Sequence, residues 1–394
     1  AINTTFTNNT AGTAGGAIFS DTGIVNTSNS HFINNNVTNG SGGAIYSNNN
    51  IIVNVTEFTN NTATLSGGAI YTSNGGVSSI NSTFTNNNAI KVNGGAIYAN
   101  NLTTIDSNYT NNTAGTSGGA IYSDTGKVLA DNVSFVNNTA VSQGGAVYAN
   151  STVNLTNSNF TNNKVNGASG TAGGAVFSND QVMADNIKFI NNTAINGLGG
   201  AIYANSTVTA NSSSEFINNS ANYGGAIYSV MGNVSSNTVT FVNNTATLSG
   251  GAIYSDNGFV TNVKTSFDNN TAGTYGGAIF AANNITSTDS NFTNNTATNT
   301  TGAGGAIYSS AGAVSTDNVN FINNTANTTG GAVYADNIIN LTNSNFTDNK
   351  VIGTQNAAGG AVFSNNQVIT DNSKFLNNTA INGLGGAIYT KNIV

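Results

Sequence analysis

Two copies of an Asp-Thr-Gly tripeptide, at residues 21–23 and 124–126, follow short apolar segments of the chain. Two carboxylates that lie in contact can share one proton, and such a pair can activate a water molecule for hydrolysis. The tripeptides therefore suggest a hydrolase that uses paired Asp side chains. This hypothesis requires a fold that brings Asp21 and Asp124 together.

The residues around these tripeptides recur along the whole chain. The string Gly-Gly-Ala-(Ile/Val)-(Tyr/Phe) occurs fifteen times between Gly15 and Gly385, with a mean spacing of about 26 residues. A second string, aromatic-x-Asn-Asn, also occurs fifteen times; Tyr109 replaces Phe once and Asp348 replaces the first Asn once. Self-similarity at a period of this length is typical of solenoid proteins.

Each repeat offers three short apolar segments separated by Asn, Gly, Ser and Thr, which is the pattern of short β-strands. The third segment has an apolar residue seven positions before the motif aromatic, and only Thr209 breaks this column. One repeat cannot bury a core alone, whereas stacked repeats can. The sequence therefore predicts an all-β fold, a single-stranded parallel β-helix of about fifteen coils over residues 1–394.

Stacking gives each column of equivalent residues a position. We expect the motif aromatics to stack inside, and the Asn residues after them to turn the chain and form an inward amide ladder. The predicted structural ladder comprises Phe6, Asn8, Asn9, Phe32, Asn34, Asn35, Phe58, Asn60, Phe135 and Asn137.

Strand alternation separates the Ile and the aromatic residue of Gly-Gly-Ala-Ile-Tyr onto opposite faces. Tyr and Phe interchange freely at that position, so we expect Ile inside and an exposed aromatic stripe outside. The alternative, in which these rings form a second core column, stays open. The predicted stripe comprises Phe19, Tyr46, Tyr71, Tyr98, Tyr122 and Tyr148.

The predicted fold changes the reading of the Asp-Thr-Gly copies. Asp21 and Asp124 would lie four coils apart, at about 19 Å, and could not share a proton. Asp131 and Asp185 would be two coils apart, at about 10 Å, which is near the carboxylate separation of an inverting glycosidase. A solvated face inherited by duplication is the favoured interpretation of this pair and of its repeat at Asp317 and Asp371.

Composition excludes several classes of function. Only 6% of the residues are charged, the net charge is -7, and the eight Lys residues form no run, so no nucleic-acid surface is expected. The chain has no Cys and one His, which disfavours a thiolate site, a metal cluster or a catalytic triad. We expect no cofactor, no metal and no transmembrane segment in this region.

Several Asn-x-Ser/Thr sequons are candidate glycosylation sites. The sequons at Asn8, Asn60, Asn137, Asn243 and Asn323 fall on the inward ladder, where a glycan could not fit. The predicted acceptors are Asn26, Asn101, Asn205 and Asn299.

The paired strings "GGAI" and "FxNN" resemble the GGA(I/L/V) and FxxN repeats of the chlamydial polymorphic membrane proteins. The sequence pattern "NNTA...GGAIY" is also similar to that of adhesin-like surface proteins of methanogenic archaea. The resemblance covers essentially the whole chain. It implies a right-handed β-helix at the cell surface, used for adhesion or as a fibre, and it supplies no catalytic residue.

The leading hypothesis is a non-enzymatic extracellular β-solenoid that serves as a surface fibre, stalk or adhesin. Its expected partners are copies of itself, end to end or laterally, and cell-surface glycans or proteins. The residues beyond Tyr389 and those before Phe6 together reproduce the spacing from Tyr98 to Tyr109. We therefore expect uncapped ends, in a segment of a longer protein or a head-to-tail filament. The alternative hypothesis is a polysaccharide lyase or hydrolase.

Overall fold

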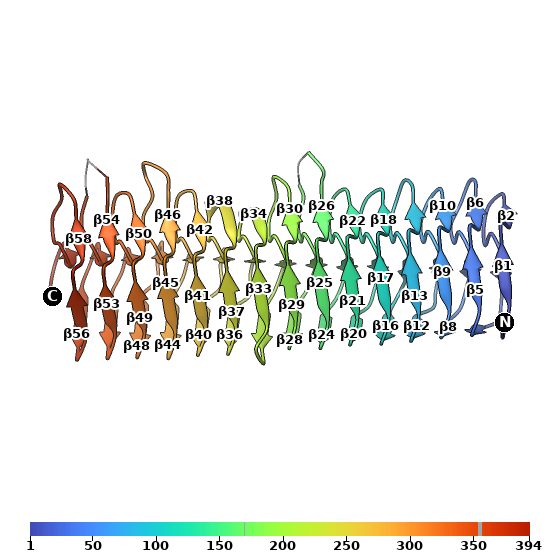
Figure 1. Ribbon diagram of the computed structural model, residues 1–394, viewed down its shortest axis with the longest axis horizontal. Helices are drawn as coiled ribbons and strands as arrows, with labels where there is room; N and C mark the ends of the chain where they lie inside the picture. Colours follow the sequence, from blue (N-terminus) through green and yellow to red (C-terminus); the bar gives the residue numbers. More distant parts are fainter. Residues whose placement is uncertain (169, 354–356) are drawn as a thin grey trace. The chain divides into compact units, whose positions relative to one another are not determined.

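The computed structural model describes residues 1–168, 170–353 and 357–394. All regular elements among these residues are β-strands, which repeat in groups of four per coil (Figure 1). The chain divides into two compact units, Ala1–Gly197 and Leu198–Val394. Each unit is a parallel β-solenoid, which confirms the predicted all-β solenoid with about fifteen coils in the chain. One continuous solenoid over residues 1–394 stays a prediction.

One coil shows how the four strands follow one another. Its strands are β16 (Leu102–Ile105), β17 (Asn108–Thr110), β18 (Thr113–Ala114) and β19 (Ile121–Ser123). Each pairs in parallel with its counterparts in the neighbouring coils, so each unit contains four sheets. We name them the Val, Phe, Ala and Tyr sheets, after a residue characteristic of each in most coils.

The first and last strands delimit each sheet within its unit. In unit 1 the Val sheet runs from β4 (Val25–Ser28) to β28 (Val182–Asp185), the Phe sheet from β1 (Thr5–Thr7) to β29 (Lys188–Ile190), the Ala sheet from β2 (Thr10–Ala11) to β30 (Thr193–Ala194), and the Tyr sheet from β3 (Ile18–Ser20) to β27 (Val176–Ser178). In unit 2 they run from β32 (Val208–Asn211) to β56 (Val368–Asp371), from β33 (Glu215–Ile217) to β57 (Lys374–Leu376), from β34 (Ser220–Tyr223) to β58 (Thr379–Ala380), and from β31 (Ile202–Ala204) to β59 (Ile388–Thr390).

The motif aromatics form a continuous column inside the Phe sheet of unit 1. The rings of Phe58 and Phe84 lie 4.8 Å apart with an interplanar angle of 1°, and Tyr109 continues the stack at 4.8 Å from Phe84. Phe58, Phe84 and Tyr109 are fully buried. The ring spacing equals the distance between paired strands, so backbone pairing alone sets this stack. The hydroxyl of Tyr109, which has no counterpart in Phe, donates to Thr104 Oγ1 at 3.1 Å.

The second Asn of each aromatic-x-Asn-Asn string forms the buried amide ladder. Asn112 Nδ2 donates to the Phe84 carbonyl at 2.9 Å and to Asn138 Oδ1 at 3.0 Å. Asn112 Oδ1 accepts from the backbone N–H and from the Nδ2 of Asn87, both at 3.0 Å. The amide thus uses both of its donors and both of its acceptor positions, which is what a fully buried polar group requires.

The first Asn of each string has a different role, and its predicted inward position is wrong. Asn8, Asn34, Asn60 and Asn137 have φ between 54° and 58° and exposed side chains. Strict alternation from the buried aromatic residue would place the first Asn inside and the second Asn outside. The left-handed conformation turns the chain, so the first Asn points outward instead. Asn34 Nδ2 donates to Asn8 Oδ1 at 3.2 Å, so these residues form an outer contact instead.

The Val sheet corrects the predicted break at Thr209. Val208, rather than Thr209, pairs with Val234 and is fully buried. The turn that follows contains two residues with positive φ, Ser212 and Ser213, where the other turns have one. One inserted residue in this turn therefore shifts the spacing to the next aromatic, while the apolar column continues unbroken.

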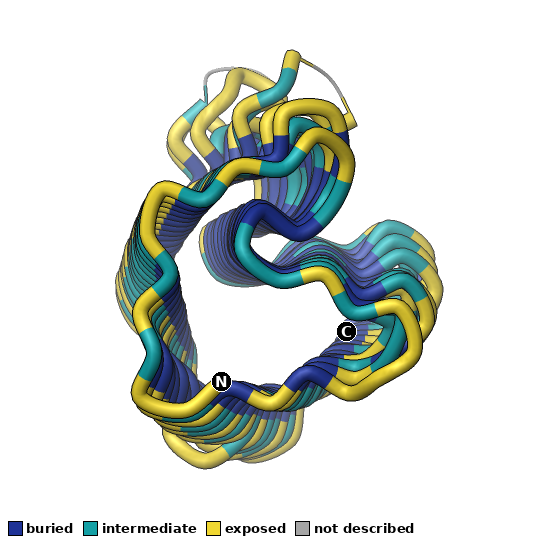
Figure 2. Tube along the Cα trace, turned by 90° about the vertical axis from the view of Figure 1, so that its right-hand side faces the viewer, coloured by how far each residue is buried: buried dark blue, intermediate teal, exposed yellow. Residues whose placement is uncertain are grey.

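The two glycines of each repeat fold the coil inward before the Tyr sheet. Gly94 has a φ of 68°, which favours Gly, and a Cβ on Gly95 would lie 1.9 Å from the carbonyl oxygen of Gly119 in the next coil. Backbone therefore packs directly on backbone here. Seen along the stack, the coils of each unit have an indented outline with buried residues at the indentation (Figure 2).

The two adjacent Asn positions allow a matched test of the ladder. Asn112→Ala should lower the free energy of unfolding by about 3 kcal/mol, because it leaves buried donors and acceptors of Asn87 and Asn138 without partners. Asn111→Gly, at φ 55° on the exposed side, should cost less than about 1 kcal/mol. Urea unfolding measures both. Equal costs for the two variants would contradict the assigned roles.

Candidate functional site

The aromatic residue of Gly-Gly-Ala-Ile-Tyr lies on the outer side of the Tyr sheet. In β15 (Ile97–Ala99), Ile97 is fully buried inside the coil, whereas Tyr98 is half-buried on the opposite face. The flanking Ala96 and Ala99 are also buried. The exposed edge of the Tyr98 ring is therefore available at the surface.

The predicted stripe residues differ in exposure along unit 1. Phe19 is 55% exposed and Tyr148 is 8% exposed. Tyr46, Tyr71, Tyr98 and Tyr122 lie between these limits. A contact role for this stripe stays a prediction.

The outer rings stack on one another as the inner rings do. In unit 1 the centroids of Tyr71 and Tyr98 are 4.7 Å apart and those of Tyr122 and Tyr148 are 4.5 Å apart. The ring faces in the column are therefore largely occupied by neighbouring rings. What the column offers to a ligand is a line of ring edges, with a phenol hydroxyl in the coils that have Tyr rather than Phe at this position.

Unit 2 has a groove over part of its aromatic column. A cavity of about 320 Å³ lies between the segments that precede Gly-Gly and the turns that follow the Tyr strands. It is lined by Tyr223, Leu248, Ser249, Tyr254, Thr274, Tyr275, Phe280, Tyr308 and Ser310. We call this surface the aromatic groove.

Two of the lining residues were missed by the sequence analysis. Tyr223 and Tyr275 immediately precede Gly-Gly, where the other thirteen repeats have no aromatic residue. The signal in the sequence is the departure of these two positions from the repeat.

Burial and nearby carboxylates raise the pKa of several phenols in the column. Burial, together with the charge of Asp256 and the neighbouring Tyr223, raises the pKa of Tyr254 to about 12. Burial and the charge of Asp336 likewise raise the pKa of Tyr308 to about 12. In unit 1, burial followed by the charge of Asp124 raises the pKa of Tyr98. Each hydroxyl can therefore donate a hydrogen bond.

Carboxylates and amides next to the column orient some of these hydroxyls. Tyr334 donates to Asp336 Oδ1 at 2.6 Å, and Asn365 Nδ2 donates to Tyr334 Oη at 2.8 Å. In the corresponding place of unit 1, Tyr148 donates to Asn150 Oδ1 at 2.9 Å. The edge of the column is thus polar and acidic, while its rings are apolar.

The carboxylates of the hydrolase hypotheses lie apart from one another. Asp21 accepts from Asn48 Nδ2 at 2.9 Å in a surface turn. Asp131 and Asp185 are exposed and are separated in the Val sheet by Thr156.

The duplicated pair has the same surroundings in unit 2. Asp317 and Asp371 are also exposed, with Thr342 between them. Asn157 donates to Asp131 at 3.1 Å and Asn343 donates to Asp317 at 3.0 Å, so an amide lies beside each of these two carboxylates.

The predicted glycosylation sites lie at the surface. Asn26, Asn101 and Asn299 are exposed, and Asn205 is partly exposed. The prediction that the sequons of the inward ladder are buried, and so cannot carry a glycan, is wrong. These sequon residues, which are also exposed, are Asn8, Asn60, Asn137, Asn243 and Asn323. Glycosylation itself stays a prediction.

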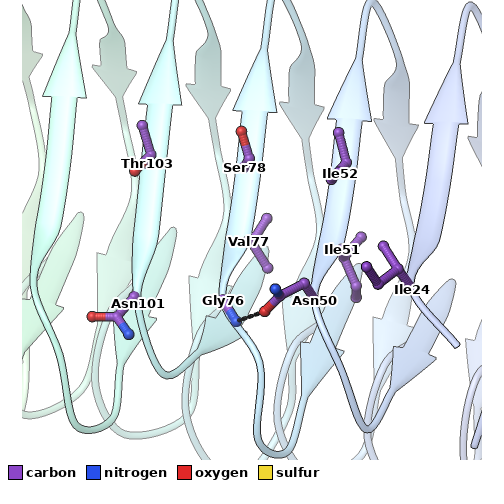
Figure 3. A pocket seen from close by; sticks show the side chains of 9 residues that line it. All are labelled: Ile24, Asn50, Ile51, Ile52, Gly76, Val77, Ser78, Asn101 and Thr103. Carbon is purple, nitrogen blue, oxygen red and sulfur yellow. Dashed lines mark hydrogen bonds between the residues drawn. The ribbon is translucent and has the colours of Figure 1, made fainter. Parts of the chain in front are cut away.

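A second cavity of about 320 Å³ lies on the outer face of the Val sheet in unit 1 (Figure 3). Its apolar side is formed by Ile24 and Ile52, which are 62% and 39% exposed. Asn50 Oδ1 accepts from the Gly76 N–H at 2.8 Å, and the predicted acceptor Asn101 also lines the cavity (Figure 3). The cavity contains no titratable lining residue and offers no acid–base chemistry.

Two further properties bear on the class of site. Within residues 1–168, 170–353 and 357–394, no three His, Cys, Asp or Glu side chains are grouped closely enough to hold a metal ion. The same described ranges contain no helix with the length and apolar character needed to cross a membrane.

Comparison with known families assigns the repeat. A model of the Chlamydia polymorphic membrane protein repeat matches twelve segments, which together cover more than half of the chain. The chain belongs to this repeat family. The matched segments of the polymorphic membrane protein repeat are residues 3–21, 55–73, 81–100, 110–124, 132–150, 186–205, 213–230, 238–256, 264–282, 289–310, 318–336 and 372–391.

Most polymorphic membrane protein repeats in the chain begin at the turn before a Phe strand and end just after a Tyr strand. Each such repeat therefore includes the buried Asn and the outer aromatic residue. Comparisons with curated proteins and with solved structures found no match. No comparison supports the resemblance to archaeal adhesin-like proteins. The repeat family and the β-solenoid fold together fit a surface protein with a structural or adhesin-like role.

Alkaline pH should destabilise the folded protein through the buried phenol of Tyr109. Burial raises the pKa of Tyr109 from 10.0 to about 12. Between these values the unfolded chain releases a proton that the folded protein retains, so the free energy of unfolding falls as pH rises above 10 and is unaffected by this group at lower pH. Phenolate absorbance and circular dichroism, recorded together, should show unfolding in this range. Tyr109→Phe should move it to higher pH; an unchanged or lower midpoint would contradict the assignment.

Proposed function

We propose that this chain is a non-enzymatic adhesin or stalk at the cell surface, whose outer aromatic column makes the contacts. The supporting observation is the outward position of Tyr71, Tyr98 and Tyr122, whose rings are stacked and half-buried and carry hydroxyls. Tyr combines a large apolar area with a polar tip and few rotatable bonds, which suits surface recognition. The inner columns fill the interior of the coils, and the outer rings of Tyr71, Tyr98 and Tyr122 remain partly exposed.

Repetition determines how such a surface binds. Neighbouring coils within a unit present nearly the same group at intervals of about 4.8 Å. A single ring edge and hydroxyl would bind weakly, whereas contacts along several coils add through effective concentration. Cell-surface glycans or proteins with repeated features are the partners that fit this arrangement.

Attachment assays test the proposal in unit 1. Particles coated with the protein are applied to cultured animal cells and to immobilised cell-surface glycans. Combined Tyr71→Ser, Tyr98→Ser and Tyr122→Ser changes should reduce attachment by about tenfold or more, because three adjacent contacts of a multivalent surface are lost. The matched control is Thr59→Ser, Thr85→Ser and Thr110→Ser on the outer side of the Phe sheet, which should leave attachment unchanged.

A folded triple Tyr variant that attaches as well as the unchanged protein would contradict the proposal. Replacement of the same three residues by Phe separates the two parts of the contact. Phe keeps the stack, since Phe occurs in this column at positions such as Phe177, but it removes the hydroxyl. An intermediate loss of attachment is expected.

We also propose that copies of the chain associate end to end. In the Phe sheet of unit 1, consecutive coils pair in the same parallel register, as in the pairing of Phe58 with Phe84 and of Phe84 with Tyr109. A coil from a second copy could use the same pattern of donors and acceptors. Electron microscopy of the purified chain should show filaments longer than one molecule; uniformly dispersed single molecules would contradict end-to-end association.

A further inference from the structure

The aromatic groove of unit 2 contains a second layer of rings. Tyr223 and Tyr275 each precede a Gly-Gly pair and lie two coils apart, and the coil between them has Ser249 at the same position. The short Ser side chain leaves a gap where a third Tyr would otherwise continue the row. This gap opens onto the cavity of about 320 Å³.

Ring geometry defines the walls of this gap. Tyr223 meets Tyr254 edge to face, with centroids 5.2 Å apart and an interplanar angle of 69°. Tyr275 stacks on Tyr308 at 4.5 Å and 28°. The cavity is thus bounded by rings from two layers, and Ser249 and Thr274 add hydroxyl groups at its edge.

The carboxylates that act on the rings of the cavity are those of Asp256 and Asp336. Asp256 acts on both Tyr228 and Tyr254, and Asp336 acts on Tyr308. The lining residues include no Lys, Arg or His. Tyr223 and Tyr275 lie outside the stacked column, and the face of an aromatic ring is the negative region of its quadrupole. These features favour a cation and disfavour an anion.

We propose that this cavity binds an organic cation, either a quaternary ammonium group or the ammonium end of a lysine side chain. Several Tyr rings around a positive group, with carboxylates nearby, are the arrangement that cation–π recognition uses. The inference rests on the proposed function in that the same groove serves as a contact surface.

Choline and its uncharged isostere, 3,3-dimethylbutan-1-ol, test the role of charge. Saturation-transfer NMR titrations on the full chain should show choline binding with a dissociation constant on the order of 1 mM, and at least tenfold weaker binding of the isostere. Equal binding of the two compounds, or no choline binding, would overturn the proposal. So would tighter binding of methyl glucoside than of choline.

A pair of short peptides distinguishes the two sources of the cation. One carries lysine and the other trimethyllysine at the same position. Displacement of choline by the lysine peptide indicates a protein side chain as the source, whereas displacement by the trimethyllysine peptide alone indicates a quaternary ammonium group. Failure of both to displace choline supports a free small cation.

Variants can be taken from residues that the repeat itself uses at the same positions. Tyr275→Ser reproduces the residue at Ser249 and should weaken choline binding about tenfold. Ser249→Tyr should abolish choline binding, because the new ring fills the gap between Tyr223 and Tyr275. Asp256→Asn, which reproduces the common residue at that turn position, should weaken binding several-fold. Thr329→Ser, at the same position outside the cavity, is the control and should change nothing.

Attachment and cation binding can fail separately. Unchanged choline affinity in folded Tyr275→Ser and Ser249→Tyr variants would overturn the cation site while leaving adhesion intact. Loss of attachment in the unit 1 Tyr variant, with choline affinity unchanged, would instead support adhesion and leave the cation site standing. Attachment unchanged in that variant, with choline bound, would overturn adhesion alone.

Discussion

The buried side-chain amide of each aromatic-x-Asn-Asn string fixes how one coil lies on the next. Asn138 donates to the carbonyl of Tyr109 and to Asn163, while its own Oδ1 accepts from Asn112. A shift of one residue would leave these groups buried without partners and would exchange the inner and outer faces of every strand. The ladder therefore selects a single register.

The outer surface follows from that register. Because each coil lies on the next without offset, Tyr residues that face outward in each coil must stack into a column, and the Gly-Gly pair folds that column inward from the surrounding turns. The rings then occupy one another's faces and retain their edges and hydroxyls for contact. Departures from the repeat, such as Tyr223, Tyr275 and Ser249, become visible as local changes in the shape and charge of this column.

The repeat in the sequence was sufficient to predict the solenoid, the Phe column and the existence of an Asn ladder. It did not separate the roles of the two Asn residues, because Asn suits both a left-handed turn and an amide ladder. One difference between the two positions indicates their separate roles. Asp348 replaces the first Asn in one repeat, whereas the second Asn is invariant. Thr209 was misplaced because a fixed spacing cannot recognise one inserted turn residue.

The groove was less accessible to sequence reasoning. Alternation placed Tyr98 opposite Ile97, but the depth of the surface around the column depends on how the Gly-Gly bend folds the backbone. Tyr223 and Tyr275 lie outside the recurring strings, and their relation to Tyr254 and Tyr308 arises only when the coils are stacked. Such contacts between neighbouring coils are set by three-dimensional packing.

Hydroxyl-radical footprinting with mass spectrometry tests the central claim, that the register separates an inner from an outer aromatic column. Tyr98 and Tyr109 are eleven residues apart and chemically identical, yet one is half-buried in the outer column and the other fully buried in the inner one. The account predicts rapid oxidation of Tyr98 and protection of Tyr109 in the folded protein, with equal rates after unfolding. Equal rates in the folded protein, or protection of Tyr98 alone, would contradict it.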